Sequence, residues 1–219
     1  SHPLKGLQRL AKDYRSRFDV PVIGITGSNG KTVVKEWIYQ LLSPERIITR
    51  SPRSYNSQIG VPLSVWLMNE RTELGIFEAG ISEMGEMEAL QSIIRPTIGI
   101  LTNIGGAHQE NFYSTSDKCM EKLTLFKDCD VVIYDADNEL INNCVGKCLF
   151  GAREIAWSKK NPEQPLYIEG VKKGDTATTI RYRYLGMPNE YTIPFIDDAS
   201  VENSIHTLAV ALYMMLSPE

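Results

Sequence analysis

Residues 24–32 read Gly-Ile-Thr-Gly-Ser-Asn-Gly-Lys-Thr. They continue from the end of an apolar run, 20–25, and are followed by a helical pattern, 33–42. A strand, a glycine-rich loop and a helix in this order are the context of a phosphate-binding loop. Glycines at 27 and 30 let backbone N–H groups converge on phosphate oxygens without interference from a Cβ atom. The helix N-terminus adds the positive end of its dipole. This segment predicts an α/β fold with a P-loop, and a chain that binds a nucleoside triphosphate.

Two side chains at the end of this loop predict its chemistry. Lys31 supplies a point charge for the outer phosphates, and the Thr32 hydroxyl is of the kind that ligates Mg²⁺. The loop departs from the usual pattern at Ile25, which stands where a glycine is usual. The residues expected to contact the nucleotide here are Gly27, Ser28, Asn29, Gly30, Lys31 and Thr32.

Strands and helices alternate along most of the 219 residues, which predicts a single α/β domain. Continuously apolar strands such as 98–102 are typical of a mostly parallel sheet with helices on both faces. The predicted strands are 20–26, 46–49, 74–78, 98–102, 131–134 and 154–157. The predicted helices are an opening helix or linker within 1–18, then 32–42, 59–68, 85–94, 116–127, 138–147 and 200–216. An alternating segment, 176–185, followed by a turn at 186–189 predicts a small antiparallel hairpin near the C-terminal end.

The composition argues against several classes of protein. A net charge of −4 disfavours binding to nucleic acid or to an anionic membrane, because both favour a basic surface. No apolar run has the length of a membrane span, and the first residues lack the hydrophobic region of a signal peptide. Cys144 and Cys148 have a spacing that allows metal binding, but reduced thiols in the interior are the more common outcome. We therefore expect a cytoplasmic protein.

Polar residues at the ends of predicted strands are candidates for the site, because open α/β sheets bind ligands at the carboxyl ends of their strands. Glu78 ends an apolar run, where a carboxylate is costly unless it is solvated or bound to a cation. This favours a Mg²⁺ ligand opposite Thr32 over a capping or exposed acid. His108 follows a Gly-Gly turn and by itself is more often an exposed loop residue than a ligand. Lys122, taken alone, reads as a solvated charge on a helix.

Together these residues form a known pattern. Five segments stand in the order, and at roughly the spacing, of the motifs of the Mur ligase family: 26–32, 55–62, 78–80, 102–108 and 121–122. The chain therefore resembles the central ATP-binding domain of that family from its opening helix to its final helix.

The resemblance implies a role for each candidate. Thr32 and Glu78 would hold the Mg²⁺ that bridges the β- and γ-phosphates, and His108 would ligate a second Mg²⁺. Lys122 matches the lysine that CO₂ carbamylates in the family, and it would support that second ion. Asn203 is similar to the adenine-contacting asparagine, although the segment before it, 197–200, lacks the family's Gly-x-His-Asn sequence.

The resemblance also implies a reaction. Residues 18–32 and the Gly85-Glu86 pair are most similar to the member that uses ATP to join D-alanyl-D-alanine to a UDP-MurNAc-peptide, through an acyl phosphate. Some short stretches of the sequence are also similar to a form fused to an alanine racemase. The family's UDP-substrate domain and C-terminal domain have no counterpart in these 219 residues, so we expect residues 1–219 alone to form no amide bond.

Three alternatives remain at this stage. The first is a ligase domain similar to folylpolyglutamate synthase, with the same chemistry on a pteridine substrate. The second is a nucleotide-dependent interaction module without chemistry, and Glu78, His108 and Lys122 in register weigh against it. The third is a small-molecule kinase, for which the sequence shows neither an acceptor site nor a lid.

Overall fold

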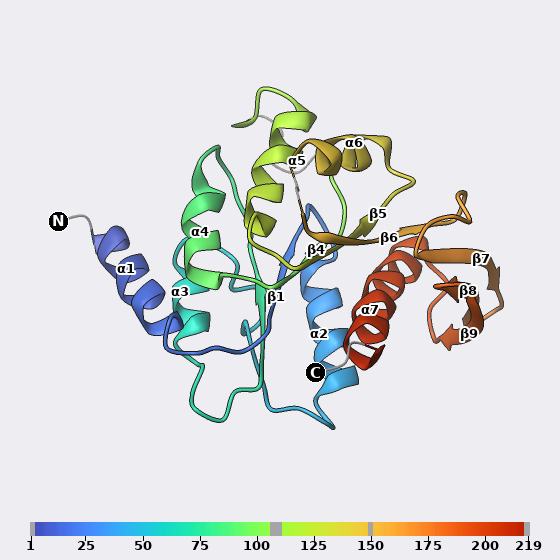
Figure 1. The fold of residues 1–219 in the computed structure, drawn as a ribbon, viewed down its shortest axis with the longest axis horizontal. Coiled ribbons are helices and arrows are strands. Elements are labelled where there is room, and N and C mark those ends of the chain that lie inside the picture. Colours follow the sequence, from blue (N-terminus) through green and yellow to red (C-terminus); the bar gives the residue numbers. More distant parts are fainter. Residues whose placement is uncertain (1–2, 106–110, 149–150, 217–219) are drawn as a thin grey trace.

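The computed structural model describes residues 3–105, 111–148 and 151–216. Its centre is one sheet of nine strands in the order β2-β3-β1-β4-β5-β6-β7-β8-β9 (Figure 1). Neighbouring strands are parallel from β2 to β7, and β8 and β9 continue the sheet in antiparallel pairing. The strands are β1 Val22–Thr26, β2 Ile48–Arg50, β3 Leu74–Glu78, β4 Ile98–Leu101, β5 Val131–Asp135, β6 Arg153–Ser158, β7 Leu166–Lys173, β8 Thr178–Tyr184 and β9 Met187–Ile193.

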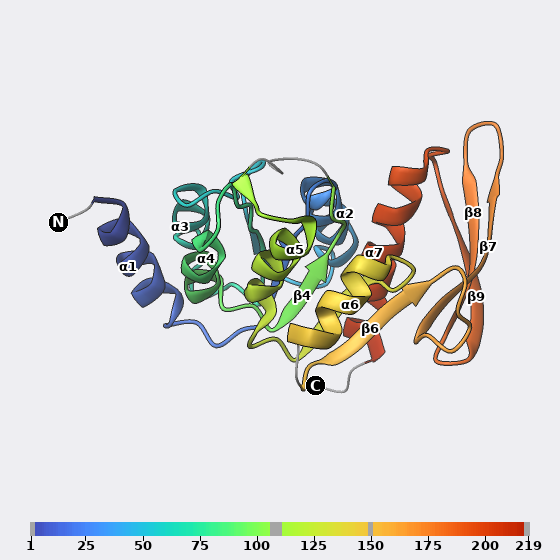
Figure 2. The ribbon, with the colours of Figure 1, turned by 90° about the horizontal axis from the view of Figure 1, so that it is seen from above.

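Helices cover both faces of the sheet (Figures 1 and 2). They are α1 Pro3–Arg15, α2 Lys31–Leu42, α3 Gly60–Val65, α4 Glu86–Ile94, α5 Thr115–Leu123, α6 Glu139–Cys148 and α7 Asp198–Leu216. One core joins α1, α3, α4, α5 and α6 to the sheet, and the other joins α2 and α7 to the opposite face. Within β1, Val22 belongs to the first core, and Ile23 and Ile25 belong to the second. Burial on both faces explains why these strands are continuously apolar.

The predicted fold class is confirmed, with corrections at several elements. β7 was not predicted from the sequence. Its pairing with β8 is irregular, with a shift of register between Ile168 and Gly170. The hairpin turn lies at Leu185 and Gly186, both with positive φ, and not over 186–189. The last three strands extend the main sheet and stand at one end of the molecule (Figure 2).

Two helices are shorter than predicted. The helix expected over 59–68 is confined to α3, and the one expected over 116–127 ends at Leu123 and continues as a 3₁₀ turn, Thr124–Phe126. The four cysteines are free thiols, three of them buried. Within the described ranges, no helix combines the length and the apolar character needed to cross a membrane.

The strand order sets the position of the site. β1 lies between β3 and β4, so the carboxyl ends of these three strands meet at one edge of the sheet. In the register, Ile25 of β1 is opposite Glu78 of β3, and Thr26 is opposite Leu101 of β4. The glycine-rich loop, Glu78 and the segment after β4 are therefore neighbours at the edge where open α/β sheets bind ligands.

Candidate functional site: a phosphate-binding loop with buried lysines

The glycine-rich loop has the backbone that its sequence predicts. Gly27 has φ 143° and Gly30 has φ 82°, conformations that other residues rarely adopt. A Cβ at Gly27 would lie 2.0 Å from Thr102 Oγ1, and one at Gly30 would lie 2.3 Å from Asn203 Oδ1. α2 begins directly after Gly30, an N-cap residue that has no side chain to cap the helix. The N–H groups of its first turn therefore lie at an end that suits an anion.

The segment after β4 holds this loop in place. Ser28 N donates to Asn103 O at 2.9 Å, and Asn29 N donates to Asn103 Oδ1 at 2.9 Å. Thr102 Oγ1 donates to Asn29 O at 2.6 Å, and Gly105 N donates to Ser28 Oγ at 2.8 Å. These contacts hold the loop in one conformation, which lowers the entropic cost of binding a ligand.

Glu78 and Thr32 lie together, as the sequence predicts. Glu78 is fully buried, and its Oε2 accepts from Thr32 Oγ1 at 3.0 Å and from Asn56 Nδ2 at 3.3 Å. Its Oε1 lies 2.9 Å from Lys35 Nζ as an ion pair, but this contact lacks the alignment of a hydrogen bond. A hydroxyl beside a buried carboxylate with one oxygen lacking a hydrogen bond is a donor set that fits Mg²⁺.

Lys35 is part of this site, and the sequence analysis missed it. It is fully buried, and besides Glu78 its Nζ lies 3.2 Å from Glu36 Oε1 and 2.8 Å from Ser51 O, and it also donates to Arg53 O. One signal was present in the sequence. Position 35 falls on the stripe of α2 that also carries the buried Ile38 and Leu42, so a lysine there required a buried partner.

Lys122 is not the solvated surface charge that it resembles when taken alone. It is 3 % exposed, and its Nζ donates to Gly27 O at 3.3 Å. Burial, with the nearby charges of Lys31 and Lys118, lowers the pKa of Lys122 to about 7. Lys31 Nζ also donates to Gly27 O, at 2.9 Å, and its pKa is lowered by burial and then by Lys118, against the raising effect of Glu78.

A pocket of about 200 Å³ joins these groups. It is lined by Gly27, Ser28, Lys31, Asn56, Ser57, Gly80, Ile81, Ser82, Lys118 and Lys122. None of the described residues that line it is acidic, and three are lysines. A small cavity with three lysines, of which Lys118 and Lys122 are buried, beside a helix N-terminus favours an anionic ligand.

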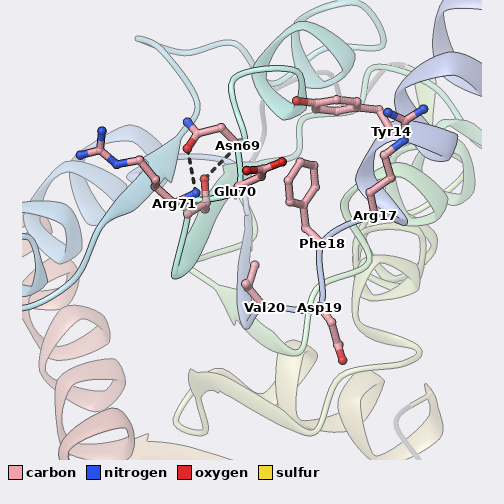
Figure 3. Close-up of a pocket in the computed structure, with 9 residues that line it drawn as sticks. Tyr14, Arg17, Phe18, Asp19, Val20, Asn69, Glu70 and Arg71 are labelled. Atoms are coloured by element: carbon pink, nitrogen blue, oxygen red, sulfur yellow. Dashed lines mark hydrogen bonds between the residues drawn. The ribbon is translucent and has the colours of Figure 1, made fainter.

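A larger pocket, about 780 Å³, lies away from the glycine-rich loop (Figure 3). It is formed by the segment that leads into β1, with Tyr14 and Phe18, and by the loop before β3. In that loop Asn69 N donates to Thr72 Oγ1 at 3.1 Å, and Arg71 N donates to Asn69 Oδ1 at 3.0 Å. These two hydrogen bonds stabilise the turn, and the pocket lies at the amino ends of the strands. The smaller pocket is the candidate site.

Comparison with known proteins places this site in a family. The family described as Mur ligase middle domain matches residues 25–211. The chain belongs to the Mur ligase middle-domain family.

The relatives of this Mur ligase middle domain are longer proteins, and the chain matches only part of each. The UDP-N-acetylmuramoyl-tripeptide–D-alanyl-D-alanine ligase of Bacillus subtilis is 31% identical over 219 residues, which are 99% of this chain and 46% of that protein. The ligase of the same name from Treponema pallidum is 42% identical over 106 residues, 48% of this chain and 23% of that protein. The chain thus spans less than half the length of these curated relatives.

Solved structures show the same fold. MurF ligase from Thermotoga maritima, in complex with ADP, has a TM-score of 0.85 at 21% identity and covers 99% of this chain and 50% of that one. The apo form of L. casei FPGS has a TM-score of 0.71 at 12% identity and covers 97% of this chain and 62% of that one. The predicted family and fold are confirmed.

The other two residues predicted for the site of this Mur ligase middle domain are Asn203 and His108. Asn203, on α7, is 8 % exposed and packs against Gly30, so it lies beside the phosphate-binding loop. His108 falls outside the described residues. Glu121, next to Lys122, contacts α4 instead: its Oε1 accepts from Met87 N, at the start of that helix, at 2.9 Å.

His206 is a buried residue of this region that the sequence analysis did not single out. Its Nε2 lies 3.0 Å from Thr102 O, and its Nδ1 accepts from Trp157 Nε1 at 3.3 Å. Burial lowers the pKa of His206 to about 4, so the ring is neutral and Nε2 carries the proton. It fixes the end of β4 next to the phosphate-binding loop.

Proposed function

We propose that this domain binds ATP with Mg²⁺ and carries the phosphoryl-transfer step of an amide ligase. The ligase would join D-alanyl-D-alanine to UDP-MurNAc-tripeptide, the reaction in the printed name of the Bacillus subtilis and Treponema pallidum relatives. The observation that carries the proposal is the position of Lys122. A buried lysine 3.3 Å from Gly27 O, inside the pocket of Lys31, has no use in a simple nucleotide switch.

The residues divide the work by position. Lys31 and the first turn of α2 would bind the phosphates, and Asn203 would contact the nucleoside side of the loop. Thr32 and Glu78 would hold Mg²⁺, which when bound neutralises charge on the β- and γ-phosphates. No side chain needs to act as a nucleophile, because positioning and charge neutralisation account for most of phosphoryl-transfer catalysis.

Lys122 would act as a carbamate. A pKa of about 7 leaves a large fraction of the amine neutral near neutral pH. The neutral Nζ attacks the carbon of CO₂, an N–C bond forms, and one proton leaves to water. The carbamate oxygens are hard ligands of the kind that Mg²⁺ prefers, and the change from cation to anion removes the repulsion with Lys31. The predicted second Mg²⁺, with His108 as its other ligand, belongs to this proposal.

The acceptor and the amine would come from elsewhere in a larger ligase. In this proposal a UDP-substrate domain and a C-terminal domain deliver the two reactants, so residues 1–219 by themselves form no amide bond. The proposal includes a cytoplasmic location, where ATP is available.

The test is phosphate release by the full-length ligase. We expect release from ATP to require both UDP-MurNAc-tripeptide and D-alanyl-D-alanine, and mass spectrometry to detect the amide product. A folate substrate with glutamate is the matched control for a folylpolyglutamate synthase-like activity. Release that responds to the folate pair and not to the UDP-MurNAc pair would overturn the proposed substrates.

A further inference from the structure

Glu78, the carboxylate proposed for Mg²⁺, has a cation of the chain itself beside it. Lys35 Nζ lies 2.9 Å from Glu78 Oε1, and both side chains are fully buried. The other oxygen, Oε2, accepts from Thr32 Oγ1 at 3.0 Å and from Asn56 Nδ2 at 3.3 Å. The chain's own residues therefore balance the charge of this carboxylate and contact both of its oxygens.

Two backbone carbonyls help to hold the Lys35 ammonium in this place. Its Nζ donates to Ser51 O at 2.8 Å and also to Arg53 O, both in the segment that follows β2. Because Lys35 is fully buried, its charge is compensated by these groups and by the nearby acids rather than by water. Lys35 thus supports the segment after β2, and a test has to separate this support from an effect on the metal.

A neighbouring ion pair leaves the charge of Lys35 to Glu78. Glu36 Oε1 lies 3.2 Å from Lys35 Nζ, but Glu36 also contacts Arg50 more extensively. Arg50 Nη2 lies 3.0 Å from Glu36 Oε2, and Arg50 Nε donates to both oxygens of that carboxylate, at 3.2 and 3.1 Å. Arg50 therefore balances Glu36, and Lys35 balances Glu78. Together these four side chains have no net charge with which to attract a divalent cation.

The negative charge that Mg²⁺ requires would then have to come with the ligand. Lys31 also lies close enough to Glu78 to interact with it electrostatically, which adds positive charge near the carboxylate. Proteins usually bind Mg²⁺ through one or two carboxylates together with the phosphates of a substrate. Phosphates bound by Lys31 would both neutralise that lysine and supply the missing negative charge.

We propose that Lys35 is a positioning residue that controls Mg²⁺ through Glu78. Its ammonium cancels the charge of the carboxylate, so the site takes up Mg²⁺ together with the nucleotide and not before it. The inference rests on the proposed binding of ATP with Mg²⁺ at Thr32 and Glu78. A purely structural role predicts the opposite sign, because loss of a supporting residue weakens metal binding, whereas loss of a restraining charge strengthens it.

The affinity for metal without nucleotide is the readout, because it does not depend on catalysis. Electron paramagnetic resonance of Mn²⁺, which takes the same kinds of oxygen ligand as Mg²⁺, would measure it in the full-length protein. Lys35→Met removes the ammonium. Arg50→Gln is the matched control, because it removes one positive charge from the neighbouring pair with Glu36. Ile38→Ala, at a buried position of the same helix, controls for lost stability without a change of charge.

We expect nucleotide-free Lys35→Met to bind Mn²⁺ about tenfold or more tightly than wild type, because a positive charge beside the carboxylate is gone. Arg50→Gln and Ile38→Ala should stay within about twofold of wild type, since the first acts on a partly exposed, screened pair and the second changes no charge. The gain should disappear when Glu78→Gln is added to Lys35→Met, which would locate the ion at that carboxylate.

Unchanged or weaker Mn²⁺ binding in Lys35→Met would overturn the inference, and so would an equal gain in either control or a gain that survives Glu78→Gln. A wild type that binds Mn²⁺ as tightly without ADP as with it would also overturn it. Circular dichroism verifies each fold, and Lys35→Gln replaces Lys35→Met if the latter does not fold.

The same measurements separate this inference from the proposed function. A wild type that binds neither ADP nor a non-hydrolysable ATP analogue in the presence of Mg²⁺ would contradict the proposed function itself. A wild type that binds both, with no gain of Mn²⁺ affinity in Lys35→Met, would contradict the role of Lys35 alone.

Discussion

Thr32 Oγ1 donates a 3.0 Å hydrogen bond to Glu78 Oε2 and so joins the first turn of α2 to the end of β3. The two residues are 46 positions apart in the chain and meet because β1 and β3 are neighbours in the sheet. The same carboxylate lies 2.9 Å from Lys35 Nζ through its other oxygen. The buried Glu78 carboxylate therefore interacts with both a hydroxyl and an ammonium.

The Lys35–Glu78 pair should be strongly coupled in stability. Both side chains are fully buried, so Lys35→Met leaves an uncompensated carboxylate in the interior, and Glu78→Gln leaves the Lys35 ammonium only the partly exposed Glu36 as a charged partner. We expect Lys35→Met and Glu78→Gln each to lower the free energy of unfolding by about 3–5 kcal/mol. The double variant should lose less than the sum, by an interaction energy of about 1–3 kcal/mol in urea denaturation.

The exposed pair Lys159–Glu202, whose charged atoms are 4.0 Å apart, is the control for this cycle. Its double-variant cycle should give a coupling of less than about 1 kcal/mol, because solvent screens it. Additive losses at Lys35 and Glu78 would show that the two residues do not interact as the structure indicates.

Lys122 should act through oxygen ligands. In the full-length ligase, Lys122→Ala should lose most of its activity, and formate or acetate should partly restore it by occupying the vacated positions. Lys127→Ala is the control, because acetate should not change its activity. A Lys122→Ala enzyme with full activity, or one that no small carboxylate rescues, would argue against the carbamate.

His206 should make the protein sensitive to mild acid. Its folded-state pKa of about 4 lies below the ordinary value of 6.5, so the unfolded chain binds the proton more readily. Stability from this group is present above pH 6.5, falls as pH drops toward 4, and is constant below that. The loss amounts to about 3 kcal/mol for a shift of this size.

His206→Gln isolates that contribution, because an amide can still donate to Thr102 O and accept from Trp157 but does not titrate in this range. Urea denaturation between pH 7 and pH 4 should show a shallower loss of stability in the variant. Parallel curves for the two proteins would show that the imidazole does not change its protonation state on unfolding.

Much of the fold followed from the sequence because its signals are local. The glycines of the phosphate-binding loop and the continuously apolar strands each depend on a few adjacent residues. β7 was missed because the irregularity between Ile168 and Gly170 breaks its alternation. The turn was misplaced because Leu185 has a positive φ there, although leucine has no preference for that conformation.

The candidate site divides in the same way. Residues with a recognisable motif, such as Thr32 and Glu78, were predicted and lie together. Lys35, Lys118 and His206 have no motif of their own, and their importance comes from burial, which depends on how distant elements pack. A lysine on a helix reads as solvent-exposed until the fold shows what covers it.

The central claim, that this domain binds ATP through its phosphate loop, has a direct measurement in the calorimetry of Lys31→Ala. Wild type should bind ADP and a non-hydrolysable ATP analogue, more tightly with Mg²⁺ than without it. Lys31→Ala should lose a charge-assisted contact of about 2 kcal/mol and bind more than about tenfold more weakly. Lys172→Ala, on the exposed part of β7, should bind as wild type does. Unchanged affinity in Lys31→Ala, or no binding by wild type, would contradict the account.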